Sequence, residues 1–263
     1  MLRTKRHSTI VTVRTPTRPR PRFHTSTPLD ASQVGTTIVL GDDAAHHAVR
    51  VLRLGRGDAL TLFDGTGGEY SATLVETSKK SVTAAIERFD DVERESPLDI
   101  TLVQAVIAAD AMDYAIRKAV ELGVTAITPV TCARSQSSPK GERAFKRIAH
   151  WQAIAVAACE QCGRNRIPPI APLQSLLDWL HANRHRKVAI AAPGAASSLR
   201  AFVGDAPPAA IVIGPEGGFT EAERAQAGAA GAVAVSLGPR VLRAETAGPA
   251  ALAMLAVLAG DAR

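Results

Sequence analysis

Two glycine-proline turns, each directly after a short apolar run, constrain the fold of this chain most. Gly214-Pro215 follows the run 209–213, and Gly238-Pro239 follows the run 233–237. Each turn leads into a stretch with helical patterning, so each run is predicted to be a buried strand followed by a helix. Parallel strands that alternate with helices carry ligand pockets at their carboxyl ends. The two turns therefore predict one pocket, built largely from backbone, at that edge of a sheet.

Strand-like and helix-like segments alternate from about residue 100 to the end of the chain. This alternation predicts an α/β region with a parallel sheet that is covered by helices on both faces. Gly123 is predicted to end the first of these helices at the C′ position. The expected strands are 100–107, 126–131, 187–192, 209–213 and 233–237, and the expected helices are 111–122, 142–162, 173–182, 221–230 and 245–258.

The preceding region has several short strands and one helix, which together predict a small β-barrel. The helix is expected at 42–54, with Ala45, Val49 and Leu52 on its buried side. A charged segment, 90–97, marks the domain boundary. The predicted organisation is a basic tail (1–19), a β-barrel domain (20–93) and a larger α/β domain (94–263), so the chain as a whole is α+β. The expected strands of the barrel are 36–40, 59–63, 69–75 and 81–89.

Composition is that of a globular protein, with 46% hydrophobic and 21% charged residues. No apolar run reaches the length of about 18 to 20 residues that a membrane span needs, so no membrane association is expected. Three cysteines do not make a disulfide framework, and a reducing, cytoplasmic compartment is expected. Cys159 and Cys162 form a C-x-x-C pair, but no second pair supplies further ligands, so no metal is expected.

The net charge of +6 is concentrated near the start of the chain. Residues 1–29 hold seven basic and no acidic residues, which leaves 24 basic and 25 acidic residues in the remainder. Any nucleic-acid contact by the body of the protein must therefore come from local patches. Residues 1–19 are compatible with a basic tail, an organelle transit peptide or a misread start codon, and the sequence does not separate these.

The second turn brings charged groups to the predicted pocket. Arg240 and Arg243 follow it three residues apart, and arginines in such a pocket usually hold an anion or a planar polar group. Glu245 and Thr246 open the last helix, where N-capping is an alternative role for Thr246. Glu216, in the first turn, is either a general base or a carboxylate that stabilises the loop.

The glycines of the first turn allow a ligand to approach the backbone closely. The turn lacks the Lys-Ser/Thr ending of a P-loop and the G-x-G-x-x-G spacing of dinucleotide sites. An NTPase or a nucleotide-binding oxidoreductase is therefore disfavoured.

Taken together, the motifs resemble those of a known family. The segment GPEGGFTxxE (214–223), followed by LGPRVLRAETA (237–247), is similar to the signature of the knotted SPOUT-class RNA methyltransferases. It is most similar to the 16S ribosomal RNA uracil-N3 methyltransferases, over about residues 20 to 260. Ala244 and Ala133 depart from the threonine and glutamate expected there. Further matching blocks lie at 20–23, 47 with 51–53, 62–65, 79–82, 121–124 and 157–164.

The resemblance implies a PUA-like N-terminal barrel, a C-terminal sheet with a trefoil knot, and a homodimer. Pattern alone predicts an ordinary doubly wound sheet. The implied reaction moves a methyl group from S-adenosylmethionine (SAM) to N3 of a specific uridine in the 16S ribosomal RNA of the small subunit. Alternatives are a ribose 2′-O-methyltransferase and a non-catalytic RNA-binding protein of ribosome assembly.

Site residues follow from this resemblance together with the two turns. Arg243, with Arg240 as second choice, is expected to stabilise charge on the uracil, and Glu216 or Glu245 to act as base. The SAM site is expected to comprise Ala192, Pro193, Gly194, Ile213, Gly214, Gly217, Gly218, Leu237, Gly238, Pro239, Val241, Leu242 and Thr246. RNA contacts are expected from Arg22, His47, Arg50, Arg53, Lys79, Lys80, Arg164 and Arg166, with Arg50 and Arg53 on one helix face.

Overall fold

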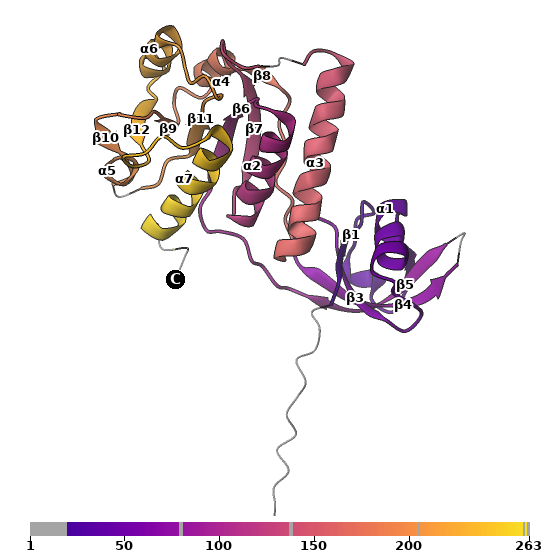
Figure 1. Ribbon diagram of the computed structural model, residues 1–263. Helices are drawn as coiled ribbons and strands as arrows, with labels where there is room; N and C mark the ends of the chain where they lie inside the picture. Colours follow the sequence, from indigo (N-terminus) through magenta and orange to yellow (C-terminus); the bar gives the residue numbers. More distant parts are fainter. Residues whose placement is uncertain (1–19, 79–80, 137–138, 205, 260, 262–263) are drawn as a thin grey trace, which may run out of the picture.

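The computed structural model describes residues 20–78, 81–136, 139–204, 206–259 and 261. Within them the chain forms two sheets, a smaller one near the start and a larger one carrying most of the helices (Figure 1). The last strand of the smaller sheet ends at Asp90 and the first strand of the larger sheet begins at Thr101. The charged segment 90–97 therefore lies in the connection between the two sheets.

The larger sheet has seven strands in the order β10-β12-β9-β11-β6-β7-β8, and every pairing in it is parallel. A helix connects each pair of successive strands except β9 and β10, largely as the alternating sequence pattern predicts. The strands are β6 (Thr101–Ala105), β7 (Ala126–Thr131), β8 (Gln174–Ser175), β9 (Val188–Ala191), β10 (Ser197–Ser198), β11 (Ala210–Ile213) and β12 (Val233–Ser236). The helices are α2 (Ala109–Glu121), α3 (Glu142–Cys162), α4 (Leu176–Ala182), α5 (Leu199–Val203), α6 (Glu221–Ala229) and α7 (Ala244–Leu258).

Both faces of this sheet are buried, which explains its near-continuous apolar strands. Adjacent strand residues point to opposite faces: Leu102 packs in the core with α2, α3 and α7, whereas Val103 packs in the core with α4 and α6. The prediction of a parallel sheet covered on both sides is confirmed. Gly123 follows the end of α2 with φ +82°, the left-handed conformation expected at the C′ position.

The smaller sheet has five strands in the order β1-β3-β4-β5-β2. All its pairings are antiparallel except that of β1 with β3. A separate hydrophobic core fills this part of the molecule, with Phe23, Leu60 and Leu74 fully buried. The strands are β1 (Arg22–His24), β2 (Thr37–Val39), β3 (Ala59–Phe63), β4 (Glu69–Thr77) and β5 (Val82–Asp90), and a 3-10 turn, η1, covers Ala31–Gln33.

The helix expected at 42–54 is divided in two. An α-helix, α1 (Asp42–His46), continues as one π-helical stretch, η2 (His47–Val51). The wider π turn rotates the later residues about the axis, so Ala44 and Ala48 are buried while Leu52 is exposed. Placing Leu52 on the buried side was wrong. Arg53 lies beyond the helix with φ +57°, so it does not share a helix face with Arg50.

A polar junction joins the two sheets. Arg22 on β1 forms an ion pair with Glu69 on β4, and its guanidinium also donates to Asn165 Oδ1 at 2.6 Å. Arg94 reaches the same Glu69 at 2.9 Å and the carbonyl oxygen of Gly163 at 3.0 Å. Burial acts to raise the pKa of Glu69, but the hydrogen bonds and charges of the two arginines hold that pKa below its usual range.

Arg164 forms the buried centre of this junction. Its side chain is 5% exposed and pairs with Glu95, with Nε 2.8 Å from Oε2. One further nitrogen, Nη1, donates to the carbonyl oxygens of Val120 and Val124, at 2.9 and 3.0 Å. Arg164 thus ties the connecting segment to the end of α2.

Candidate active site

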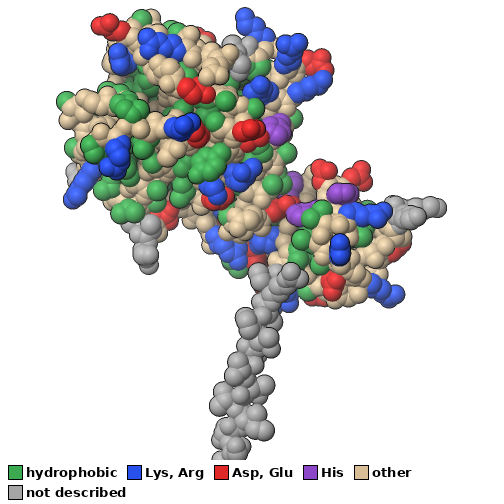
Figure 2. All heavy atoms as spheres, viewed as in Figure 1, with side chains coloured by type: hydrophobic (Ala, Val, Ile, Leu, Met, Phe, Trp, Pro, Cys, Tyr) green, Lys and Arg blue, Asp and Glu red, His purple; other side chains and the backbone are tan. Residues whose placement is uncertain are grey.

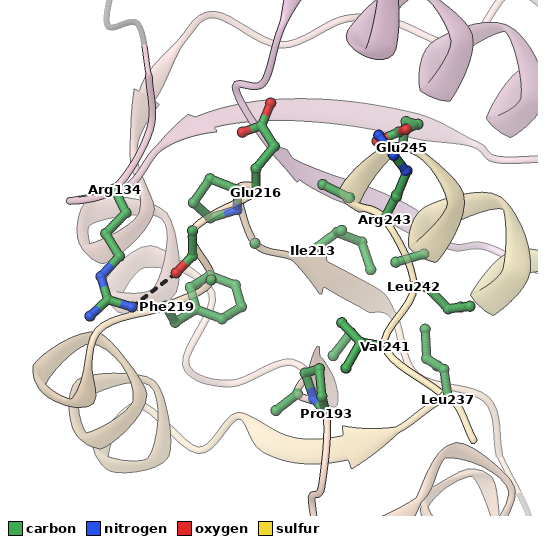
Figure 3. A pocket seen from close by; sticks show the side chains of 18 of the residues that line it. Arg134, Pro193, Ile213, Glu216, Phe219, Leu237, Val241, Leu242, Arg243 and Glu245 are labelled. Carbon is green, nitrogen blue, oxygen red and sulfur yellow. Dashed lines mark hydrogen bonds between the residues drawn. The ribbon is translucent and has the colours of Figure 1, made fainter. Parts of the chain in front are cut away.

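One pocket of about 480 Å³ opens at the carboxyl ends of β9, β11 and β12, beside the start of α7 (Figure 3). This is the sheet edge predicted from the two turns. Gly194, Pro239 and Thr246 are not among its lining residues. The predicted SAM residues that line it are Ala192, Pro193, Ile213, Gly214, Gly217, Gly218, Leu237, Gly238, Val241 and Leu242.

The first turn is held closed by its own backbone. The amide of Gly218 donates to the carbonyl oxygen of Pro215 at 2.8 Å, and Gly218 has φ +67°, which favours glycine. A Cβ on Gly214 would lie 3.0 Å from the ring of Phe219, closer than most side chains approach, so glycine leaves room for the ring as it stands. These contacts shape the backbone wall of the pocket after β11.

The Glu216 carboxylate accepts the backbone amide of Ala108 at 3.0 Å, immediately before α2. This position at a helix N-terminus is favourable for a carboxylate. The contact favours the loop-stabilising role for Glu216, although the residue also lines the pocket.

The second turn carries the two predicted arginines into the pocket. Arg240 and Arg243 are both exposed and line it, and neither side chain has a hydrogen bond or ion pair with another described residue. Figure 3 shows Arg243 beside Glu245. Arg243 occupies the N-cap position of α7, and no side chain caps the helix, so the alternative capping role of Thr246 is not observed. Thr246 is exposed.

Two pocket arginines, Arg134 and Arg224, were missed by sequence reasoning. Arg134 follows β7 and donates to the carbonyl oxygen of Gly217 at 2.9 Å. Arg224 lies on α6, next to Glu223. The sequence Thr220-x-x-Glu223 can be recognised as a capping box. The contact of Glu223 with the loop after β7 joins distant residues, so the sequence around Glu223 gives no indication of it.

Glu223 is a buried carboxylate that joins two elements. It accepts the backbone amide of Ala133 at 2.7 Å and that of Thr220 at 2.8 Å. Burial acts to raise the pKa of Glu223, but these hydrogen bonds and the charge of Arg134 outweigh it, so the pKa lies below its usual range.

We expect Glu223→Gln to lower the free energy of unfolding by about 1–2 kcal/mol at pH 7, because the charged acceptor is lost. Because the pKa of Glu223 is lower in the folded state, its carboxylate stabilises the protein at pH values above the unfolded-state pKa of about 4.3. This stabilisation is lost as the pH falls through the folded-state pKa. The difference between the two proteins should therefore shrink between pH 5 and pH 3, measured by urea unfolding. A constant difference at all pH values would contradict this assignment.

Comparison with known proteins decides the family. The model of the RNA methyltransferase domain matches residues 94–256, more than half of the chain, and that of the RNA methyltransferase PUA domain matches 40–87. The chain belongs to the RNA methyltransferase family. Its N-terminal part is accordingly a PUA-like domain.

Relatives in this family cover nearly the whole chain. "Ribosomal RNA small subunit methyltransferase E" of Buchnera aphidicola subsp. Acyrthosiphon pisum is 32% identical over 92% of this chain and 94% of its own. The protein of the same name from Bacillus subtilis is 31% identical, over 80% and 86%. A crystal structure of that enzyme from Neisseria gonorrhoeae, bound to S-adenosyl methionine, is 40% identical, with a TM-score of 0.83 over 91% of this chain and 98% of that one.

The residues predicted to contact RNA lie in different environments in the structure. Arg22 and Arg164 are engaged in the junction between the sheets, and their side chains are largely buried there, which argues against the RNA contacts predicted for them. Arg166 is exposed and 3.4 Å from Glu93. Arg50 and Arg53 are exposed, and His47 lies edge-on to the ring of Phe23. Lys79 and Lys80 lie outside the described residues, as does the tail 1–19.

Charge on the face drawn in Figure 2 is mixed, with Lys and Arg side chains interspersed among Asp and Glu. This agrees with a body that is not uniformly basic. Among the described residues, no helix is both long and apolar enough to cross a bilayer.

The cysteines lie away from any cluster of ligands. Cys159 is buried inside α3, and Cys162 ends the same helix. In the described part of the chain, no three His, Cys, Asp or Glu side chains gather as a set of metal ligands. Burial raises the pKa of the Cys132 and Cys159 thiols to about 12, so neither is a thiolate nucleophile at neutral pH.

Proposed function

We propose that this chain transfers the methyl group of SAM to N3 of a uridine in the 16S ribosomal RNA of the small subunit. The observation that carries the proposal is the pocket, where the backbone of two glycine-proline turns meets the unpaired Arg240 and Arg243. Membership of the RNA methyltransferase family and the names of the relatives support it.

The residues present fit SAM. The volume of about 480 Å³ is that of a small-molecule site. Ile213, Leu237 and Leu242 offer apolar walls for the adenosine, and the turn backbones offer donors and acceptors to the adenine edge. When bound, SAM supplies a methyl group on a sulfonium, which is already electrophilic.

The chain's own residues then have to position the acceptor and make N3 nucleophilic. Loss of the N3 proton puts negative charge on the uracil carbonyl oxygens, and we assign its stabilisation to Arg243, which lines the pocket. The N3–C bond forms as the C–S bond breaks, and the proton leaves to a base. The Glu216 carboxylate is engaged with Ala108, whereas the Glu245 carboxylate has no hydrogen bond or ion pair with another described residue. Glu245 is therefore our choice of base.

Two features of the family fold are part of the proposal, a closed N-terminal barrel and a trefoil knot. The knot is supported by strand order, because β12 lies between β9 and β10, which precede it in the chain. The segment after β12 then leads to α7, which packs on β11 and α2. A crystal structure whose chain trace unthreads when pulled at both ends would contradict the knot.

We also propose a homodimer that uses the exposed side of α7. Met254, Val257 and Leu258 are exposed apolar residues there, and Figure 2 shows hydrophobic side chains along this helix. Mass measured by light scattering should be twice that of the chain, and a monomer at micromolar concentration would contradict the dimer. Free Cys132, Cys159 and Cys162 support action in a reducing compartment, the cytoplasm.

The reaction is tested with radiolabelled SAM on 16S RNA, both naked and within 30S particles lacking the modification. We expect label in 16S RNA and, after digestion, 3-methyluridine by nucleoside mass spectrometry. A 2′-O-methylated nucleoside would replace the proposal with ribose methylation. SAM binding by calorimetry separates both from a non-catalytic RNA-binding protein.

A further inference from the structure

A second pair of arginines lies on a pocket wall that the reaction proposed above does not use. Arg134 comes from the loop after β7 and Arg224 from α6, and both are exposed. Figure 3 shows Arg134 across the pocket from Arg243. Including Arg240, four arginines and only two glutamates line the pocket, which therefore favours an anion beyond the uracil itself.

One buried carboxylate brings this pair together. Glu223 is 6% exposed and accepts the amide of Ala133 at 2.7 Å. Arg134 is the residue after Ala133, and Arg224 is the residue after Glu223. The hydrogen bond therefore holds the backbone positions of the two arginines on the same wall, and Glu223 acts as a positioning residue for both.

Both guanidinium groups retain free donors. Arg134 Nη1 donates to the carbonyl oxygen of Gly217. The aliphatic part of the Arg134 side chain packs against Gly217, where an added Cβ would lie 3.2 Å from Arg134 Cβ. That leaves most of its five N–H donors unused by the described residues. The side chain of Arg224 has no hydrogen bond or ion pair with another described residue. Within the described part of the chain, neither guanidinium group forms an ion pair with a carboxylate. Glu223 and Arg134 interact only through their charges at longer range.

We propose that Arg134 and Arg224 bind a backbone phosphate of the RNA strand that carries the target uridine. This inference rests on the proposed function. Arginine pairs match phosphate oxygens in geometry and charge, and a base presented on its Watson–Crick edge must be flipped out, which requires its backbone to be held. The methionine carboxylate of SAM has the same anionic chemistry, but an exposed pair at the pocket rim suits the larger, incoming strand.

The test is the salt dependence of binding to a 16S RNA transcript, measured by filter binding from 50 to 300 mM KCl. Because the two arginines bind one phosphate, losing that contact in the double variant Arg134→Ala/Arg224→Ala should reduce the slope of log Kd against log salt by about 0.7, and each single variant should reduce it by less. Arg134→Lys keeps the charge and should keep the slope. Arg184→Ala is the matched control, because Arg184 is exposed just before β9, at the opposite edge of the sheet, and should leave the slope unchanged.

SAM affinity by calorimetry is measured on each variant, both as a check of folding and to separate the two sources of anion. A reduced slope with retained SAM affinity supports the proposal. An unchanged slope overturns it, and if SAM affinity falls at the same time the pair belongs to the SAM carboxylate. A wild-type protein that binds RNA with this salt dependence but transfers no methyl group would contradict the proposed function and leave the phosphate site standing.

Discussion

Arg243→Ala is expected to lower kcat by about 10² to 10³-fold while leaving the affinity for SAM largely intact. The arginine lines the pocket at the start of α7, and its side chain has no hydrogen bond or ion pair with another described residue, so its truncation breaks no internal polar contact there. The missing charge is felt only when negative charge develops on the uracil. Methyl transfer to 30S particles gives kcat, and calorimetry gives the affinity for SAM.

Arg240→Ala is the natural comparison, because Arg240 lines the same pocket three residues earlier. A small effect of Arg240→Ala beside a large effect of Arg243→Ala supports the assignment. Full activity in Arg243→Ala would remove this arginine from the mechanism, and the reverse order of effects would transfer its role to Arg240.

Arg164→Ala is expected to destabilise the protein by about 3–5 kcal/mol, which is the cost of leaving the partner of a buried ion pair alone. The substitution removes the charged partner of the Glu95 carboxylate and one donor to each of the carbonyl oxygens of Val120 and Val124. Thermal and urea unfolding measure the loss. The affinity for SAM below the unfolding transition should persist, since Arg164 is not part of the pocket.

Arg166→Ala serves as the control for position, two residues further on. Its side chain is 57% exposed and its pair with Glu93 is long, so less than about 1 kcal/mol is expected. If Arg164→Ala were as stable as Arg166→Ala and instead lost affinity for RNA, the role of Arg164 in the junction would be refuted and the original RNA assignment restored.

The larger sheet was predictable because its signals are local. Apolar runs of four to six residues separated by helical periodicity define parallel strands, and α3 was predicted with its observed ends. Elements of two to five residues, such as β1, β8, β10 and α5, carry too little periodicity to be recognised. The π turn at His47 was also beyond reach, because nothing in the local pattern of apolar residues separates it from an α-helix.

The pocket was only half predictable. Its turns could be recognised from Gly214 and Gly238. Glycine suits the close packing against Phe219 at position 214 and the positive φ at position 238. Arg134 and Arg224 reach the same pocket through the hydrogen bond between Glu223 and Ala133, which joins residues 90 positions apart. The junction formed by Arg22 and Arg164 could not be predicted for the same reason, since basic residues in family-like motifs gave no indication of their acidic partners, Glu69 and Glu95.

The pocket is assembled from segments spread over the second half of the chain, from Arg134 to Ala247, and the last of them begins α7 near the C-terminus. The chain must therefore be synthesised and folded through the start of α7 before the site exists. Nascent or truncated chains that stop before α7 lack one wall of the pocket, so they do not compete for the methyl donor, and donor binding reports on chains folded through that helix.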